Sequence, residues 1–398
     1  MQLGRAILGY VAVITAVITL APFRFATSPV HGMSWVWTVS DIVLNIVMFV
    51  PLGFLHQLTR APAHGTEGDE RARSWLRALV LGATVSASIE LAQLFESERF
   101  TSFIDIVTNA TGALVGSVLH SIVARRVRAA SAVRSLALEL PLMGLLYLLV
   151  PLVWLAGLTS GDGARPWLLL PIAAVAGGVL GTVHAAYVAP AKPRSLWWLV
   201  GATIAWYAVA VLPSGIRNAS IVAAGGALAV GVSALRSIAT ARYREGAPAT
   251  AEGRRFELPT LRLLLPLFAA YLALSSLWPL DAAEPVWYAG IALLPPWIEA
   301  TKENVLVALE HIAAFTLVGY IIAEFHGRAV RDYRHMLPRV VLWSGGISLM
   351  LEATRGWHPL YGASASMLLL TCAAGGFGGW LYHLQRDHVR ALLACGRR

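Results

Sequence analysis

The chain contains the sequence Asp-Ile-Val-x-Asn twice, each time inside an apolar stretch long enough to cross a membrane. The first copy runs from Asp41 to Asn45 and the second from Asp105 to Asn109. A spacing of four residues places the carboxylate and the amide on one helix face, about 6 Å apart along the axis. An ionisable side chain inside an apolar span costs roughly 3 kcal/mol to insert, so it usually has a partner and a function.

Further polar residues lie between the two copies, near the ends of apolar stretches. If consecutive stretches cross the membrane in alternate directions, Asp41 begins one helix, Glu90 ends the next and Asp105 begins the third. All three carboxylates then fall at the same outer membrane face. We therefore expect eight residues to form a site at one end of a four-helix bundle: Asp41, Asn45, Glu90, Gln93, Arg99, Ser102, Asp105 and Asn109.

The chemistry that this set would support follows from its charge. Three carboxylates and one nearby arginine leave an excess of negative charge, which requires a proton, a cation or a cationic ligand group. The alternative is structural. Asp105 could cap its helix, Arg99 could neutralise Glu90 or Asp105, and the two asparagines could cross-link helices. For each residue alone we favour the structural role, but for the whole set we favour a ligand-binding site.

The composition indicates an integral membrane protein. Hydrophobic residues make up 57% of the 398 residues, charged residues 13%, and the mean hydropathy is +0.65. Soluble domains carry about 25% charged residues. The apolar stretches are continuous rather than alternating, which favours helices over a barrel. The sequence predicts an all-α, polytopic membrane helix bundle of about 12 transmembrane helices, at 4–23, 36–57, 75–95, 102–124, 135–157, 167–190, 195–213, 219–237, 260–279, 303–326, 338–354 and 360–383.

The net charge of +9 is explained by topology better than by nucleic-acid binding. With a cytoplasmic N-terminus, alternate loops hold all but six of the 31 lysines and arginines, the exceptions being Arg24, Arg99, Arg165, Arg217, Lys302 and Arg355. This is the positive-inside bias of a plasma-membrane protein. We expect both termini to be cytoplasmic, membrane lipids to be partners, and no nucleic acid to bind.

Weak internal similarity divides the helices into three blocks of four. We expect a first domain at 1–130, a connecting block of four apolar helices at 131–257, a degenerate second copy at 258–390, and a cytoplasmic tail at 391–398. In the second copy, His311 takes the place of Asn45 and Glu352 takes the place of Glu90. Val307 stands where Asp41 would fall. His311 and Glu352 therefore form a weaker second candidate site, and we expect this copy to be mainly architectural.

Other kinds of chemistry have little support in the sequence. It contains no Walker sequence, nucleophile elbow, dinucleotide-binding fingerprint or HExxH pair. His311 follows Glu310, but no second histidine or cysteine lies at metal-ligand spacing, so we expect neither a metal nor a cofactor. Cys372 and Cys395 form no disulfide framework. We therefore expect a protein that is not an enzyme.

The residues of the first block resemble the VanZ-like family. The resemblance covers about residues 5–125 and rests on Asp41, Asn45, Phe49-x-Pro51-x-Gly53, Glu90-x-x-Gln93-x-Phe95, Arg99, Ser102, Asp105, Asn109 and Gly112. Members are small four-helix bacterial membrane proteins, named for a component of glycopeptide-resistance clusters associated with teicoplanin resistance. The third block is similar to a shorter form of the motif at His311, Phe315 and Gly319. The resemblance implies a bacterial plasma membrane and a possible role in antibiotic resistance.

Three functions are consistent with these features. The first is a non-enzymatic cell-envelope protein whose outer cluster binds a polar or cationic group on an envelope lipid, precursor or glycopeptide. The second is a proton- or cation-coupled secondary transporter built from two repeated bundles. The third is a membrane-embedded hydrolase or transferase that uses paired carboxylates as acid and base.

The distribution of positive charge predicts that the loop after the second span is cytoplasmic. A single cysteine introduced by Thr66→Cys should therefore react with membrane-impermeant maleimide only after the cells are opened. A cysteine placed next to Arg99 is the matched control and should react in intact cells. Labelling of the cysteine at 66 from outside would overturn the predicted orientation.

Overall fold

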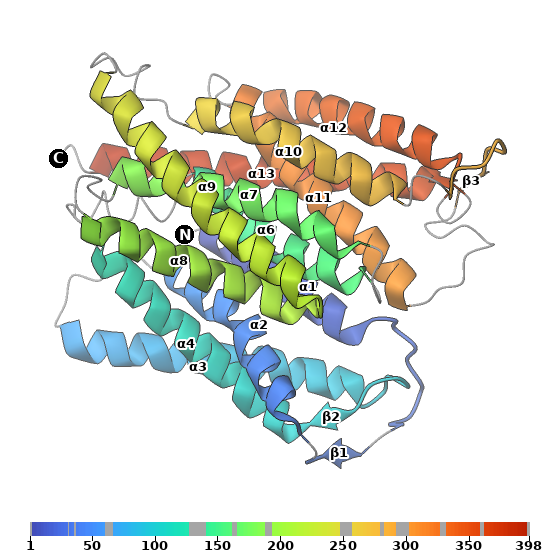
Figure 1. The fold of residues 1–398 in the computed structure, drawn as a ribbon. Helices are drawn as coiled ribbons and strands as arrows, with labels where there is room; N and C mark the ends of the chain where they lie inside the picture. Colours follow the sequence, from blue (N-terminus) through green and yellow to red (C-terminus); the bar gives the residue numbers. More distant parts are fainter. Residues whose placement is uncertain are drawn as a thin grey trace. The chain divides into compact units, whose positions relative to one another are not determined.

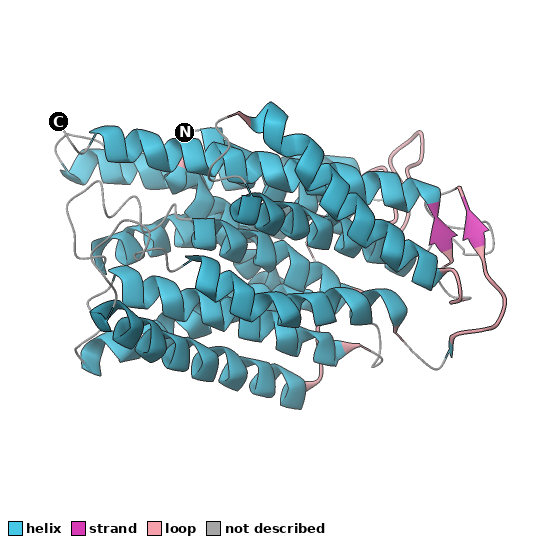
Figure 2. Cartoon of the chain, turned by 90° about the horizontal axis from the view of Figure 1, so that it is seen from above, coloured by secondary structure: helices cyan, strands magenta, loops and turns pink. Residues whose placement is uncertain are grey.

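The computed structural model of the chain describes residues 2–30, 32–35, 37–59, 67–126, 141–160, 165–187, 193–246, 257–278, 282–291, 302–326, 332–358 and 362–395. Most residues in these ranges are helical, as Figure 2 shows. The prediction of an all-α polytopic bundle is confirmed. The contacts divide the chain into two compact units, residues 1–138 and 139–398, and each is described by itself. The second unit includes the predicted second copy and all but the first eight residues, 131–138, of the predicted connecting block.

The first unit contains four helices and one pair of very short strands, which Figure 1 shows in blue to cyan. The strands pair in parallel, with Met33 opposite Thr101 and Ser34 opposite Ser102. They join the connection before the second helix to the connection before the fourth. The elements are α1 (Gln2–Leu20), β1 (Met33–Ser34), α2 (Val39–Leu58), α3 (Glu67–Gln93), β2 (Thr101–Ser102) and α4 (Phe103–Arg126).

The second unit contains eight helices in its described part, and a second parallel strand pair. Here Ala289 pairs with Ala363 and Gly290 with Ser364, so the strands again precede the second and fourth helices of a four-helix block. The elements are α6 (Pro141–Leu158), η1 (Pro166–Leu168), α7 (Leu169–Tyr187), α8 (Pro193–Val211), η2 (Leu212–Ser214), α9 (Ala219–Gly246), α10 (Glu257–Leu277), β3 (Ala289–Gly290), α11 (Lys302–His326), α12 (Tyr333–Arg355), β4 (Ala363–Ser364) and α13 (Ala365–Cys395).

The twelve described helices correspond in order to the twelve predicted spans, but two of them differ from the other ten. Ten helices are long and apolar enough to cross a membrane. The apolar part of α1, Gly4–Leu20, is shorter. Helix α12 is not among the ten because polar residues such as Arg334, Arg339 and Glu352 lower its hydropathy. Helix α13 continues to Cys395, so residues 391–395 of the predicted tail are helical.

The closest helix packing in the first unit is between α2 and α4, whose backbones touch. A Cβ atom at Gly53 would overlap the carbonyl group of Ala113, and a Cβ atom at Gly116 would overlap that of Val50. Only glycine allows this approach. In lipid, apolar helices gain little from burying apolar area against each other, so close contact between small residues provides much of the association energy.

The same arrangement recurs twice in the second unit. Helices α11 and α13 touch where Gly319 meets the backbone of Gly375, and where Gly378 meets that of Thr316. Helices α7 and α9 touch where Gly177 meets the backbone of Ala229. In each of the three predicted four-helix blocks, the second and fourth helices are therefore in backbone contact through glycine.

This packing predicts a position-dependent effect of adding one methyl group. Gly53→Ala should lower the free energy of unfolding by about 1–3 kcal/mol, because the new Cβ cannot fit without moving α4. Gly9→Ala, in an exposed part of α1 with no atom within 4 Å of the added group, is the control. It should be neutral or stabilising by up to about 1 kcal/mol. Thermal unfolding in one detergent measures both, and equal melting temperatures would contradict the close contact.

Candidate functional site

The first turns of α2 and α4 bring two of the predicted carboxylates together. Asp105 in α4 is close to the Asn45 and Ser102 side chains and is repelled by the charge of Asp41. Asp41 also shapes its own helix. Its carboxylate accepts a hydrogen bond from the backbone N–H of Thr38 at 3.0 Å, and the Thr38 hydroxyl accepts one from the N–H of Asp41 at 3.2 Å. This reciprocal capping box starts α2.

The third carboxylate, Glu90, lies in the last turn of α3 and is almost completely buried, with 3% exposed. Its Oε2 atom accepts a hydrogen bond from the backbone N–H of Ser102 at 2.7 Å. Glu90 therefore holds the turn that leads into α4, which is a structural role. It is also close enough to Asp105 for the two carboxylates to repel each other. The structure thus brings Asp41, Glu90 and Asp105 to one end of the α2–α3–α4 group.

One turn deeper, the two predicted asparagines differ in burial. Asn45 is half-buried, whereas Asn109 is 5% exposed and donates a hydrogen bond from Nδ2 to the Ser86 hydroxyl at 2.9 Å. The Oδ1 atom of Asn109 is buried without a hydrogen-bond partner, and so is the hydroxyl of Ser102. Ser102 lies beside Asp105, close enough for its hydroxyl to favour the Asp105 carboxylate, although no well-formed hydrogen bond joins the two side chains. Most buried polar atoms are satisfied, so two unpaired atoms beside a charged cluster require an explanation.

Arg99 and Gln93 lie elsewhere than the sequence suggested. Arg99 donates from Nη2 to the backbone carbonyls of Ile18 at 3.3 Å and Ala21 at 3.4 Å, and Gln93 donates to that of Thr19 at 3.1 Å. Both satisfy carbonyl groups at the end of α1, which has no further helical turn to bond them. Burial lowers the pKa of the Arg99 guanidinium, while Glu96 and Glu98 act in the opposite direction.

The structural alternative in which Arg99 neutralises Glu90 or Asp105 does not match these contacts. Its hydrogen bonds go to backbone carbonyls, and the nearby carboxylates that influence it are Glu96 and Glu98. In the described part of the first unit, no lysine or arginine pairs with Asp41, Glu90 or Asp105. Among the described residues of this unit, the three carboxylates therefore form a cluster without a side-chain cation.

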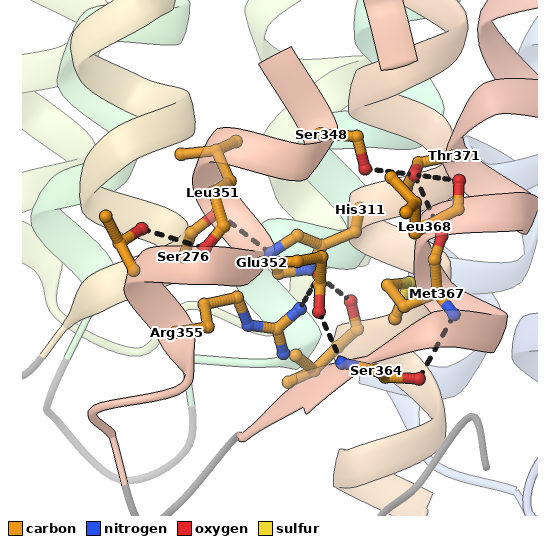
Figure 3. A network of polar contacts seen from close by, with 12 residues as sticks. Ser276, His311, Ser348, Leu351, Glu352, Arg355, Ser364, Met367, Leu368 and Thr371 are labelled. Atoms are coloured by element: carbon orange, nitrogen blue, oxygen red, sulfur yellow. Dashed lines mark hydrogen bonds and ion pairs between the residues drawn. The ribbon is translucent and has the colours of Figure 1, made fainter. Parts of the chain in front are cut away.

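The second unit repeats this arrangement around Glu352, shown in Figure 3. We call it the frame: a buried glutamate near the end of the third helix of a block accepts a hydrogen bond from the backbone N–H of a serine before the fourth helix. Glu352 accepts a hydrogen bond from the backbone N–H of Ser364 at 2.8 Å, just as Glu90 does from Ser102. Its other oxygen accepts one from the Arg355 guanidinium at 2.7 Å, and both residues of this ion pair are at least 94% buried. The Ser364 hydroxyl accepts a bond from the N–H of Met367 at 3.1 Å.

This frame fixes the register between the two copies. Counting from the shared serine, Met367 takes the place of Asp105 and Thr371 takes the place of Asn109; counting from the shared glutamate, Arg355 takes the place of Gln93. Thr371 bonds to Ser348 at 2.6 Å, at the position where Asn109 bonds to Ser86. The contacts thus align Ser364 with Ser102, and the second copy has no carboxylate at the position of Asp105.

Several buried polar residues of the second unit contact one another or the ends of neighbouring helices, which was not predicted from the sequence. Glu310 is 1% exposed and accepts hydrogen bonds from the hydroxyls of Thr159 and Tyr271, each at 2.7 Å. Arg165 donates to the backbone carbonyl of Ser275 at the end of α10. Thr159 and Arg165 belong to the predicted connecting block, so this block does more than join the two copies with apolar helices. Their signal in the sequence was weak because both lie at helix ends.

The second predicted site residue of this unit, His311, is 4% exposed. Its Nε2 atom pairs with the Ser276 hydroxyl at 3.1 Å, and Nδ1 contacts the carbonyl of Val307 at 2.8 Å. A serine paired with a histidine is the arrangement that a hydrolase would need, and no such pair was apparent in the sequence. Ser276 is only 1% exposed and the histidine is oriented by a carbonyl rather than a carboxylate. This geometry is that of an interhelical hydrogen bond between α10 and α11.

Metal coordination has limited geometric support in the described part of the chain. No three or more histidine, cysteine, aspartate or glutamate side chains converge there closely enough to hold a metal ion. Asp105 is repelled by Asp41 and itself repels Glu90, but the three carboxylates are not arranged as a common set of metal ligands.

These features define a multi-pass, all-α membrane protein with a polar cluster at one end of its first four helices. The family comparison agrees: residues 6–125 match the family described as VanZ/LLP1. The VanZ-like resemblance predicted for about residues 5–125 is confirmed by this match, which covers the first four helices. No curated protein and no solved structure matches the chain significantly.

The two glutamates predict losses of stability of different size for the same substitution. Glu352→Gln should lower the free energy of unfolding by about 3 kcal/mol or more, because it leaves the buried Arg355 guanidinium without its counter-charge. Glu90→Gln should cost less than about 1 kcal/mol, since the amide oxygen still accepts from Ser102 and the repulsion with Asp105 disappears. Unfolding of both variants in one detergent measures this, and equal losses would show that Glu90 also depends on a buried cation.

Proposed function

We propose that this protein is a VanZ-like component of the bacterial cell envelope that binds a cationic group through Asp41, Glu90 and Asp105. The ligand is an envelope lipid, an envelope precursor or a glycopeptide-type molecule, reached from the outer face of the plasma membrane. The binding step requires no chemistry on the ligand. Resistance to envelope-directed antibiotics is the physiological consequence to test first.

The observation that carries this proposal is the contrast between two similar frames. In the second unit, Arg355 neutralises the buried Glu352. In the first unit, Gln93 stands at the corresponding position and bonds to α1, while two further carboxylates lie near Glu90. Like charges held together at partial burial cost free energy, and a bound cation removes that cost.

We further propose that residues 258–390 are a second copy of the VanZ-like domain that has kept the frame and lost the site. The support is the recurrence of four features: the parallel strand pair, the glycine contact between second and fourth helices, the glutamate–serine hydrogen bond and the serine–threonine or serine–asparagine pair. In this interpretation the first copy binds the ligand and the second is architectural.

A secondary transporter is the second candidate, and Glu310 is the observation that favours it. This glutamate lies inside the long apolar helix α11, between the hydroxyls of Thr159 and Tyr271. A buried carboxylate within a span is a common position for a proton-coupling group. In a transporter, Glu310→Gln should abolish function, whereas in the binding protein it should alter only stability.

The charge contrast predicts the effect of one substitution. Gln93→Arg places a guanidinium next to Glu90 and so copies the Glu352–Arg355 arrangement. Neither this variant nor Asp105→Asn should complement a deletion strain. Each should lower the inhibitory concentration of teicoplanin at least tenfold relative to the wild-type protein, because each change removes net negative charge from the cluster. The measurement is the inhibitory drug concentration at equal membrane abundance of each variant.

His311→Ala is the control for this experiment. It removes one interhelical hydrogen bond of the second unit, costs about 1 kcal/mol of stability and should still complement. Full complementation by Asp105→Asn together with failure of His311→Ala would place the function in the second unit and contradict the proposal.

A further inference from the structure

We propose that the group bound by the first unit is a primary ammonium, one that carries N–H donors, rather than a quaternary ammonium or a divalent metal ion. This inference rests on the proposed function, because it specifies the chemistry of the same site. The observations that carry it are the two buried, unpaired oxygen atoms of Ser102 and Asn109 next to the carboxylate cluster.

The unpaired atoms continue the site inward from the carboxylates. Ser102 lies beside Asp105, and Asn109 is one helical turn deeper than Asp105 on the same face of α4. Both side chains are more than 90% buried, so water is not a ready partner for them. Leaving a buried acceptor unsatisfied is unfavourable, and a ligand that donates hydrogen bonds removes this penalty.

The second unit shows that the frame itself does not require these atoms to be unpaired. There, the hydroxyl that corresponds to Ser102 belongs to Ser364 and accepts a hydrogen bond from the N–H of Met367. The group that corresponds to Asn109 is the Thr371 hydroxyl, which bonds to Ser348 and to the carbonyl of Met367. The same fold thus satisfies every corresponding position in one copy and leaves two unpaired in the other.

The charged and neutral acceptor groups of the first unit determine which kind of cation fits best. Asp41, Glu90 and Asp105 provide negative charge, and the Ser102 hydroxyl and Asn109 amide oxygen provide neutral acceptors. A primary ammonium has one positive charge and three N–H donors, so it matches both requirements at once. A quaternary ammonium meets only the charge requirement. A divalent metal needs several ligands converging at about 2–2.6 Å, and the acidic side chains of the described residues do not converge in this way.

The test is a binding comparison on the full chain in nanodiscs made of phosphatidylcholine and phosphatidylglycerol. Ethanolamine and choline are the probes, because they differ only in whether the nitrogen carries hydrogens or methyl groups; magnesium chloride is the third probe. Ethanolamine should bind at least about tenfold more tightly than choline, the factor expected for one charge-assisted hydrogen bond. Asp105→Asn should weaken the binding of both amines.

Ser102→Ala and Ser364→Ala form the matched pair of variants. Ser102→Ala should reduce the preference for ethanolamine over choline and leave the melting temperature unchanged, because its hydroxyl makes no well-formed hydrogen bond in the fold. Ser364→Ala should keep the preference and lower the melting temperature, because its hydroxyl caps the N–H of Met367. If Ser102→Ala instead lowers the melting temperature and keeps the preference, the unpaired hydroxyl is not part of the site and the inference fails.

The outcomes separate this inference from the function on which it rests. Equal binding of ethanolamine and choline, weakened in Asp105→Asn, would overturn the primary ammonium and keep cation binding. Preferential binding of magnesium would also overturn the primary ammonium while keeping cation binding. Binding of none of the three probes would overturn both. If ethanolamine binds, replacing phosphatidylcholine by phosphatidylethanolamine in the nanodisc shows whether a lipid headgroup competes, and soluble glucosamine shows whether an amino sugar does; competition by either supports the inference.

Discussion

The close contact of α2 with α4 determines what the rest of the first unit can do. Helices in lipid are not driven together by the hydrophobic effect, so their association depends on backbone proximity and hydrogen bonds. Gly53 and Gly116 provide the proximity. Because the contact fixes the two helices in register, the Asp-Ile-Val-x-Asn sequences at their beginnings face the same region, and Asn45 comes close to Asp105. A larger residue at the contact would separate the carboxylates as well as the helices.

A second constraint is the hydrogen bond from a buried glutamate to the backbone before the fourth helix. It is present in both units, through Glu90 and Glu352, and it costs free energy because a carboxylate must be buried to make it. The two units offset this cost differently. In the second unit Glu352 pairs with Arg355, and this pair is neutral, whereas in the first unit Glu90 lies near a second carboxylate. This difference, and not the fold, makes the first unit the better candidate for recognition.

Much of the architecture could be predicted from the sequence, because apolar stretches of membrane length are a strong signal. The convergence of Asp41, Glu90 and Asp105 followed from the alternating direction of the spans. The partners of Arg99 could not be predicted, since its hydrogen bonds go to backbone carbonyls of α1 and carbonyls have no sequence signature. Arg165 was missed for the same reason. The equivalence of Met367 with Asp105 could not be predicted either, because the alignment of the two copies depends on the Glu352–Ser364 hydrogen bond.

The parallel pairing of β1 with β2 has an electrostatic consequence for the cluster. The paired strands precede α2 and α4, with four residues between β1 and α2 and none between β2 and α4, so the two helices start close together and run in the same direction. Each helix N-terminus carries about half a positive charge from its aligned peptide dipoles. Two adjacent N-termini therefore supply roughly one positive charge to Asp41 and Asp105, which occupy their first turns. The backbone thus keeps two carboxylates together without a fixed cationic side chain, and leaves net negative charge for an exchangeable partner.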